Sequence, residues 1–362
     1  MKSEMEKNSQ NNNHNHDNDS DNAHNHHHTL QIMNQSKQNK SHRHAHMHGA
    51  VDPSILTTER GIWAIKWSFV GLLITALFQI IIVVFTGSIA LLADTVHNIG
   101  DAFTAIPLLF AFLLSRLKPS KRFTYGYGRV EDIAGVFVVL MILFSGLFAG
   151  YVSVVRFFHP QEVTYIWAVA LAAIVGCIGN EAVAQLRIRV GNEIGSAALI
   201  ADGQHARADG LTSLAVLIGA VGVYLGYPTA DPVIGLIITI AIFWIVWESG
   251  KTIFTRLLDG TDPEIIDEIY HAAEHVNGVI EVTDVKVRWL GHRLHAEINI
   301  TVNSELSVEE GHEITQNYRH ELLHHLKFLS DATIHMDPVD ASGPEFHHIT
   351  EHSHEGLPVH SH

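Results

Sequence analysis

Two histidine–aspartate pairs are the residues of this chain whose types and spacing suggest chemistry. His97 precedes Asp101 by four residues in ADTVHNIGD, and His205 precedes Asp209 by four residues in ADGQHARAD. Residues four apart share one face of an α-helix, so each segment, if helical, presents an imidazole beside a carboxylate. Two such helices facing each other would surround one point with two nitrogen and two oxygen ligands. That set suits a tetrahedral divalent ion, above all zinc.

The sequence around the two pairs decides whether they indicate a metal site. A single pair is common on a solvated helix and would mean little alone. Both pairs here run into apolar sequence, and ionisable groups at membrane depth are costly and are kept for ion sites or pathways. The sequence therefore predicts one intramembrane metal site, formed by His97, Asp101, His205 and Asp209.

The elements that would position these pairs are apolar segments in the middle of the chain. Of its 362 residues, 47% are hydrophobic, although both ends are very polar. A helix needs about 20 apolar residues to cross a bilayer. Six segments reach that length, which predicts a multi-pass membrane protein in contact with lipid; they are 62–85, 88–114, 130–157, 163–183, 199–225 and 231–254.

The basic residues between these segments predict the orientation. Lys and Arg gather after the second, fourth and sixth segments, whereas the other links are short and nearly free of them. The positive-inside rule then places both termini in the cytoplasm. No cleavable signal peptide is expected, and the compact loops favour a bacterial plasma membrane.

Composition excludes several other classes. The net charge of −15 counts 28 His as neutral, and no broad basic surface indicates nucleic acid. The single cysteine, Cys177, rules out a disulfide framework and a thiolate cluster. Four ligands would fill a tetrahedral shell and leave no open metal position, so an intramembrane metallohydrolase is disfavoured and the protein is not expected to be an enzyme.

Four regions are expected along the chain. Residues 1–58 form a low-complexity His-rich tail that cannot bury a core and could capture divalent metal weakly. Residues 59–257 form the transmembrane domain with six helices, and 258–338 a cytoplasmic domain for metal binding and dimerisation. Residues 339–362 form a second His-bearing tail.

The cytoplasmic domain is predicted to be α+β, in the order αββαβ. Helices are expected at 263–276 and 307–326, the second opened by a capping box of Ser307 and Glu310. Strands are expected within 279–290, 292–302 and 331–336, with helices on one face of the sheet.

Strand alternation in this domain suggests a second metal site. In SDATIHMDP, His335 and Asp337 point away from the apolar face, and His295 shares the polar face of its own strand. Together with His312 at the start of the second helix, these side chains could converge on a cytoplasmic metal ion. The alternative is that they are ordinary surface residues of a His-rich protein.

In combination, these motifs resemble the cation diffusion facilitator family of metal transporters over about residues 60–338. The resemblance rests on the six segments, both HxxxD pairs, FTYGYGRVEDIAG before the third segment and the final HMDP. It implies a homodimer with transport sites in each subunit and a ferredoxin-like cytoplasmic domain. The His-first order of the second-segment pair resembles the zinc-preferring members.

The resemblance also implies roles for individual residues. It assigns His97, Asp101, His205 and Asp209 to the transport site. It assigns a second group to a cytoplasmic site, namely His295, His312, His335 and Asp337, and it matches Arg129 and Asp259 to a charge contact between the two domains.

The expected activity is zinc efflux from the cytoplasm driven by inward proton movement, because zinc needs neutral His and ionised Asp and so competes with protons. Zinc would be both the transported substrate and a regulatory ligand. Efflux of cadmium, cobalt, nickel or iron stays open, since ligand affinity alone does not identify the physiological ion. A metal sensor that does not transport is the other alternative.

Overall fold

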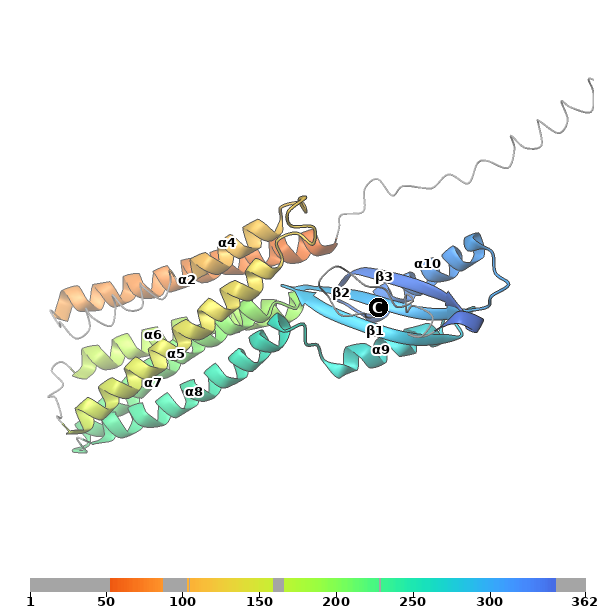
Figure 1. Ribbon diagram of the computed structural model, residues 1–362. Coiled ribbons are helices and arrows are strands. Elements are labelled where there is room, and N and C mark those ends of the chain that lie inside the picture. Colours follow the sequence, from red (N-terminus) through yellow and green to blue (C-terminus); the bar gives the residue numbers. More distant parts are fainter. Residues whose placement is uncertain (1–52, 87–102, 104, 159–165, 228, 343–362) are drawn as a thin grey trace, which may run out of the picture. The chain divides into compact units, whose positions relative to one another are not determined.

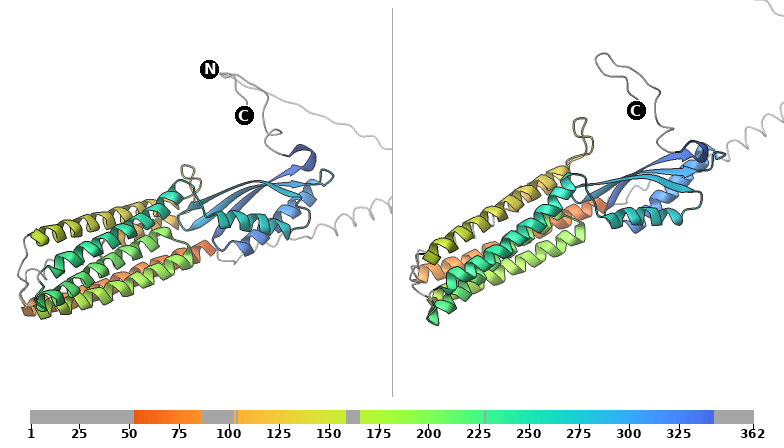
Figure 2. Two further views of the ribbon diagram at one scale, coloured as in Figure 1. Left: turned by 90° about the horizontal axis from the view of Figure 1, so that it is seen from below. Right: turned by 60° about the horizontal axis from the view of Figure 1, so that its bottom comes forward.

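The computed structural model of the protein describes residues 53–86, 103, 105–158, 166–227 and 229–342. Within them, five helices are long and apolar enough to cross a membrane. These helices run side by side (Figures 1 and 2); they are α2 (Pro53–Thr86), α5 (Arg129–Phe158), α6 (Ile166–Ile194), α7 (Ala197–Tyr224) and α8 (Ala230–Leu257).

These five helices correspond to five of the six predicted segments, and each extends beyond the predicted bounds at one end or both. The second segment, 88–114, lies mostly outside the described residues, and its end is the shorter apolar helix α4 (Ala105–Ser115). The outer surface of the bundle is apolar, as a lipid environment requires, with Phe78, Phe144 and Trp244 each more than half exposed.

The turn between α6 and α7 is set by two residues. Gly195 has φ of 77°, the left-handed conformation that glycine adopts most readily at a helix end. Ser196 follows as the N-cap of α7 and accepts a hydrogen bond from the backbone nitrogen of Leu199. This short link makes α6 and α7 antiparallel neighbours.

The C-terminal domain has the predicted order of elements. These are α9 (Pro263–Glu274), β1 (Glu281–Leu290), β2 (Arg293–Val302), α10 (Val308–His325) and β3 (Leu329–Pro338), followed by the 3₁₀ turn η1 (Val339–Ala341). Strand β2 is central, antiparallel to β1 and parallel to β3. The capping box of Ser307 and Glu310 is present at the start of α10.

Both helices of this domain cover the apolar face of the sheet (Figure 2). Ile298 and Ile300 of β2 are buried there with Tyr318 and Leu322 of α10, and the Tyr318 hydroxyl donates to the carbonyl of Ile269 in α9 at 2.8 Å. The alternation predicted for β2 is therefore confirmed, and the polar residues of β2 and β3 lie on the opposite face.

Candidate functional site

His205 and Asp209 lie one turn apart on α7, inside the helical bundle. Their side chains are buried, with 1% and 6% of the residue surface exposed, and Nε2 of His205 is 3.8 Å from Oδ2 of Asp209. The predicted i, i+4 juxtaposition is thus observed for this pair. His97 and Asp101 lie outside the described residues, so the four-ligand arrangement stays a prediction.

A second carboxylate on the same face of α7 was not singled out from the sequence. Asp202, one turn before His205, is fully buried and forms an ion pair with the equally buried Arg187 of α6 at 3.0 Å. Two charges buried together are tolerated because each compensates the other. The charge of Asp202 is therefore compensated by the guanidinium of Arg187. Asp202 and Asp209 both belong to the segment ADGQHARAD, and the sequence alone does not show which of them pairs with an arginine.

Helices α6 and α7 approach each other closely around these residues. A Cβ atom added at Gly203 would lie only 3.0 Å from the backbone nitrogen of Ile188. A Cβ atom at Gly210, next to Asp209, would lie 3.4 Å from Cβ of the buried Asn180. The glycines thus let α6 form a tight wall beside the His205–Asp209 pair.

In the C-terminal domain, the structure brings two of the four predicted ligands together. Nε2 of His335 is 3.0 Å from Oδ1 of Asp337 on the polar face of β3. The parallel register places Asn299 of β2 opposite His335 and Thr301 opposite Asp337. Asn299 carries no distinguishing signal in the sequence, and only the strand register places it beside His335.

The other two predicted ligands lie elsewhere in the same chain, so the expected convergence of all four is not observed within one chain. His295 is opposite Asp331, four residues before His335 on β3, which is about 13 Å along a strand. His312 belongs to the helix layer, where its Nε2 is 2.7 Å from Nε2 of Gln316. Among the described residues, no group of three or more His, Cys, Asp or Glu side chains is arranged to hold a metal ion.

His295 instead lines a cavity of about 340 Å³ between the 115–128 segment and the sheet, together with Arg293 and Asp331. Burial lowers the pKa of His295. The carboxylate of Asp331 raises this pKa, and the guanidinium groups of Arg288 and Arg293 lower it further. His295 therefore favours its neutral form.

A buried polar network connects the helical bundle to the turn between β1 and β2. Glu131 in the first turn of α5 has Oε2 2.6 Å from Nδ1 of His292, and its Oε1 accepts from the Ser196 hydroxyl at 2.5 Å. Nε2 of His292 is 3.1 Å from the hydroxyl of Thr58 in α2. We call these four residues, each at most 3% exposed, the junction network.

Neighbouring contacts reinforce the same junction. Oδ2 of Asp132 accepts from the backbone nitrogen of Gly291 at 3.1 Å. Arg256 at the end of α8 donates to the carbonyl of Gly195 at 2.7 Å and stacks over the Trp289 ring at 4.0 Å. The ion pair between Arg129 and Asp259, implied by the resemblance, is present.

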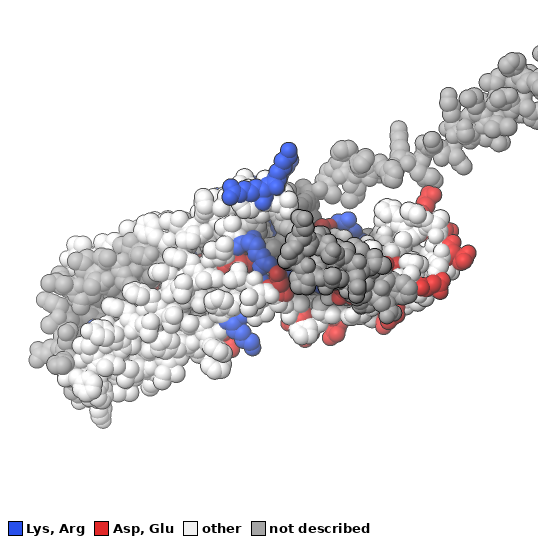
Figure 3. All heavy atoms as spheres, in the orientation of Figure 1, with Lys and Arg blue, Asp and Glu red and all other residues white. Residues whose placement is uncertain are grey.

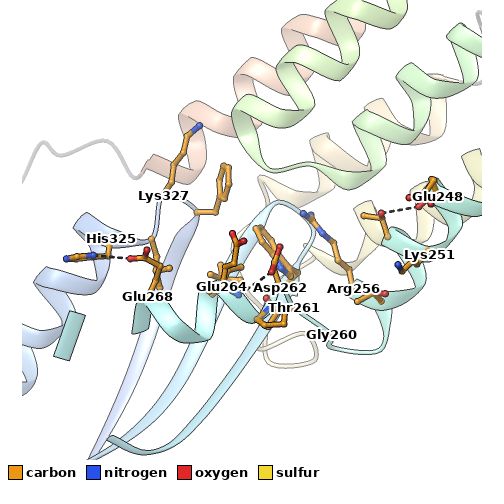
Figure 4. A pocket seen from close by; sticks show the side chains of 18 residues that line it. Glu248, Lys251, Arg256, Gly260, Thr261, Asp262, Glu264, Glu268, His325 and Lys327 are labelled. Carbon is orange, nitrogen blue, oxygen red and sulfur yellow. Dashed lines mark hydrogen bonds and ion pairs between the residues drawn. The ribbon is translucent and has the colours of Figure 1, made fainter. Parts of the chain in front are cut away.

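Charged residues mark the same end of the bundle. Figure 3 shows a bundle surface almost free of charge, with Lys and Arg side chains gathered near its end and Asp and Glu spread over the C-terminal domain. A second cavity, of about 720 Å³, is lined at this end by the last turns of α8, the start of α9 and residues 325–328 (Figure 4).

Comparison with known proteins extends these observations. The sequence model described as the cation efflux transmembrane domain matches residues 65–258, and the one described as the cation efflux protein cytoplasmic domain matches residues 261–339. The chain is 50% identical to a Mycobacterium tuberculosis protein named "Probable cation efflux system protein", over 80% of this chain and 88% of the relative.

Two more distant relatives carry metals in their names. The manganese efflux system protein of Bacillus subtilis is 24% identical over 75% of this chain and 94% of its own length. The cadmium, cobalt and zinc/H(+)-K(+) antiporter of Bacillus velezensis is 28% identical over 70% of this chain and 80% of its own length.

Proposed function

Because this chain belongs to the cation efflux family, whose members are multi-pass membrane transporters of divalent cations rather than enzymes, we propose that it exports Zn²⁺ from the cytoplasm in exchange for protons. The observation that carries the proposal is the pair of His205 and Asp209, buried together on α7 with 3.8 Å between Nε2 and Oδ2. A buried imidazole beside a carboxylate supplies half of a tetrahedral zinc shell.

The proposed transport site is completed by His97 and Asp101 from the second membrane segment. Two imidazoles and two carboxylates favour zinc over manganese, which prefers a shell of oxygen ligands. Cadmium and cobalt are the nearest alternatives in ligand chemistry, and nickel and iron stay open. Since the manganese efflux relative shares the family, family membership supports divalent cation efflux and the ligand set supports zinc.

Proton coupling follows from the same ligands. Zinc binds imidazole nitrogen and carboxylate oxygen only when these groups are deprotonated, so binding of the metal displaces protons. A site that faces the two sides of the membrane alternately would carry zinc outward and protons inward, with His205 and His97 as the proton-carrying ligands.

We place both termini in the cytoplasm of a bacterial cell, with the protein in the plasma membrane as a homodimer. The basic residues at one end of the bundle support this orientation by the positive-inside rule. We assign the four regions as expected from the sequence: a His-rich tail (1–58), a membrane domain (59–257), a cytoplasmic domain (258–338) and a second tail (339–362).

The cytoplasmic domain would hold a regulatory zinc ion centred on His335 and Asp337. His295 and His312 complete this site only if a second copy of the chain brings them to it, because in one chain they lie away from His335. Zinc shared between copies in this way would tighten the dimer as cytoplasmic zinc rises.

The test is zinc flux in proteoliposomes with an imposed pH gradient. Asp209→Asn removes one charged ligand, whereas the control Asp231→Asn removes an aspartate in the first turn of α8 that pairs with Arg156 at 3.1 Å. Flux lost in Asp209→Asn but kept in Asp231→Asn supports the proposal. Equal flux in both variants contradicts the site, and zinc binding without flux by the wild type would favour the metal sensor.

A further inference from the structure

Three imidazoles outside both proposed sites lie together on the helix layer of the C-terminal domain. His271 and His275 are four residues apart at the end of α9, and His325 ends the neighbouring α10. The ring centroids are 4.8 Å apart for His271 and His275, and each is 5.6 Å from that of His325. The cluster therefore bridges two helices and brings together imidazoles that are 50 or more positions apart in the chain.

The first two imidazoles already have a spacing that a metal ion requires. Nε2 of His271 is 3.4 Å from Nε2 of His275. Two nitrogen ligands at about 2.0–2.1 Å from a tetrahedral zinc ion are about 3.3 Å apart. A zinc ion can thus enter between these two atoms with little movement of either side chain.

Two carboxylates hold the outer nitrogens of the cluster. Oε2 of Glu274 is 3.3 Å from Nδ1 of His271, and Oε2 of Glu268 is 3.2 Å from Nδ1 of His325; the second contact is drawn in Figure 4. A carboxylate on Nδ1 fixes the tautomer that leaves Nε2 available as a metal ligand. The same arrangement therefore occurs on both helices.

We propose that His271, His275 and His325 form a surface site for zinc or a similar divalent cation, which clamps the end of α9 to the end of α10. The described side chains do not already form a complete three-ligand group, so the ring of His325 turns toward the pair when the metal binds. His325 and the exposed His271 leave the fourth position open to water. This site is separate from the proposed transport function.

A second pair on α10 provides the matched control. His320 and His324 are also four residues apart, with 3.1 Å between their Nε2 atoms and 4.5 Å between ring centroids. Within the described part of the chain, no third imidazole forms a ring contact with this pair. It therefore has the same spacing without the bridge to another helix.

The experiment is hydrogen exchange measured segment by segment on the full chain in detergent, with added zinc or with chelator. Because exchange is read for each segment, metal held by His-rich tails does not obscure the result. We expect zinc to slow exchange at residues 270–276 and 320–326 together in the wild type and in His320→Ala/His324→Ala. We expect this protection to be lost in His275→Ala and in His325→Ala.

The carboxylates provide a finer test. Glu268→Gln should raise the zinc concentration for half-maximal protection about 10–100-fold, as loss of an outer-shell partner typically does. Glu264→Gln, in the same cavity wall but without an imidazole contact, should leave it unchanged. Protection that persists in His275→Ala and His325→Ala, or that is lost only in His320→Ala/His324→Ala, would overturn the proposal.

Discussion

Glu131 of α5 and His292 of the β1–β2 turn meet as a buried pair, 2.6 Å apart and each at most 3% exposed, although 161 positions separate them in the chain. Removing one partner leaves a buried polar or charged group unsatisfied. We therefore expect His292→Ala to destabilise the protein by about 3–5 kcal/mol, the usual consequence of breaking a buried pair.

Thermal unfolding in detergent measures this effect. The exposed His320 of α10 supplies the control, since His320→Ala removes a surface imidazole whose Nε2 lies 3.1 Å from that of His324. An unchanged unfolding midpoint in His292→Ala would mean that the junction network does not hold the two domains together.

The buried ion pair of Arg187 and Asp202 predicts a compensated double variant. Asp202→Leu alone leaves a guanidinium that is 1% exposed without its carboxylate, and should prevent folding or destabilise by several kcal/mol. Replacing both residues with apolar ones of similar size, as in Arg187→Met/Asp202→Leu, should recover most of the stability.

The same double variant separates structure from transport. If Asp202 only pairs with Arg187, the refolded double variant keeps zinc flux, whereas Asp209→Asn loses it even when folded. Zinc flux absent from a well-folded double variant would instead place Asp202 among the groups that handle the ion.

The strand register predicts which neighbour supports His335. Asn299 lies opposite His335, and His295 lies four residues away along the sheet. If the ligands of the cytoplasmic site all come from one chain, zinc-dependent activation of transport should be abolished in His335→Ala. The same activation should be weakened in Asn299→Ala and unchanged in His295→Ala. Loss of activation in His295→Ala would indicate that a second copy supplies this imidazole.

His295 also predicts a pH dependence of stability in the absence of metal. Its folded pKa lies below the unfolded value of about 6.5 because burial and two arginines disfavour the charged form. The contribution of neutral His295 to the free energy of unfolding is therefore fully present above pH 6.5 and is lost as the pH falls through the folded pKa. Unfolding midpoints at pH 7.5 and 5.5 should differ less in His295→Gln than in the wild type, and an equal difference would contradict this assignment.

The sequence predicts most of the fold because its signals are local. Long apolar segments predict the five described spanning helices, and alternation with a capping box predicts the αββαβ domain. Likewise, the i, i+4 spacing predicts the meeting of His205 and Asp209. Each of these relationships depends on residues close together in the chain.

Relationships between distant residues could not be predicted in the same way. The pairing of Asn299 with His335 depends on strand register, and that of Glu131 with His292 depends on how the β1–β2 turn meets the bundle. Asp202 and Asp209 have the same local signal, and only the packing of α6 against α7 shows that Asp202 pairs with Arg187. The same holds for His295, since alternation specifies its face of the sheet, whereas the register that places it opposite Asp331 depends on strand pairing.

The most direct test of zinc–proton exchange records both ions at once. Proteoliposomes loaded with a pH-sensitive dye and a zinc-sensitive dye receive a zinc pulse, for the wild type and His205→Ala. The account predicts zinc entry with simultaneous proton movement in the opposite direction, both lost in His205→Ala. Zinc entry in the wild type without proton movement, or equal fluxes in His205→Ala, would contradict it.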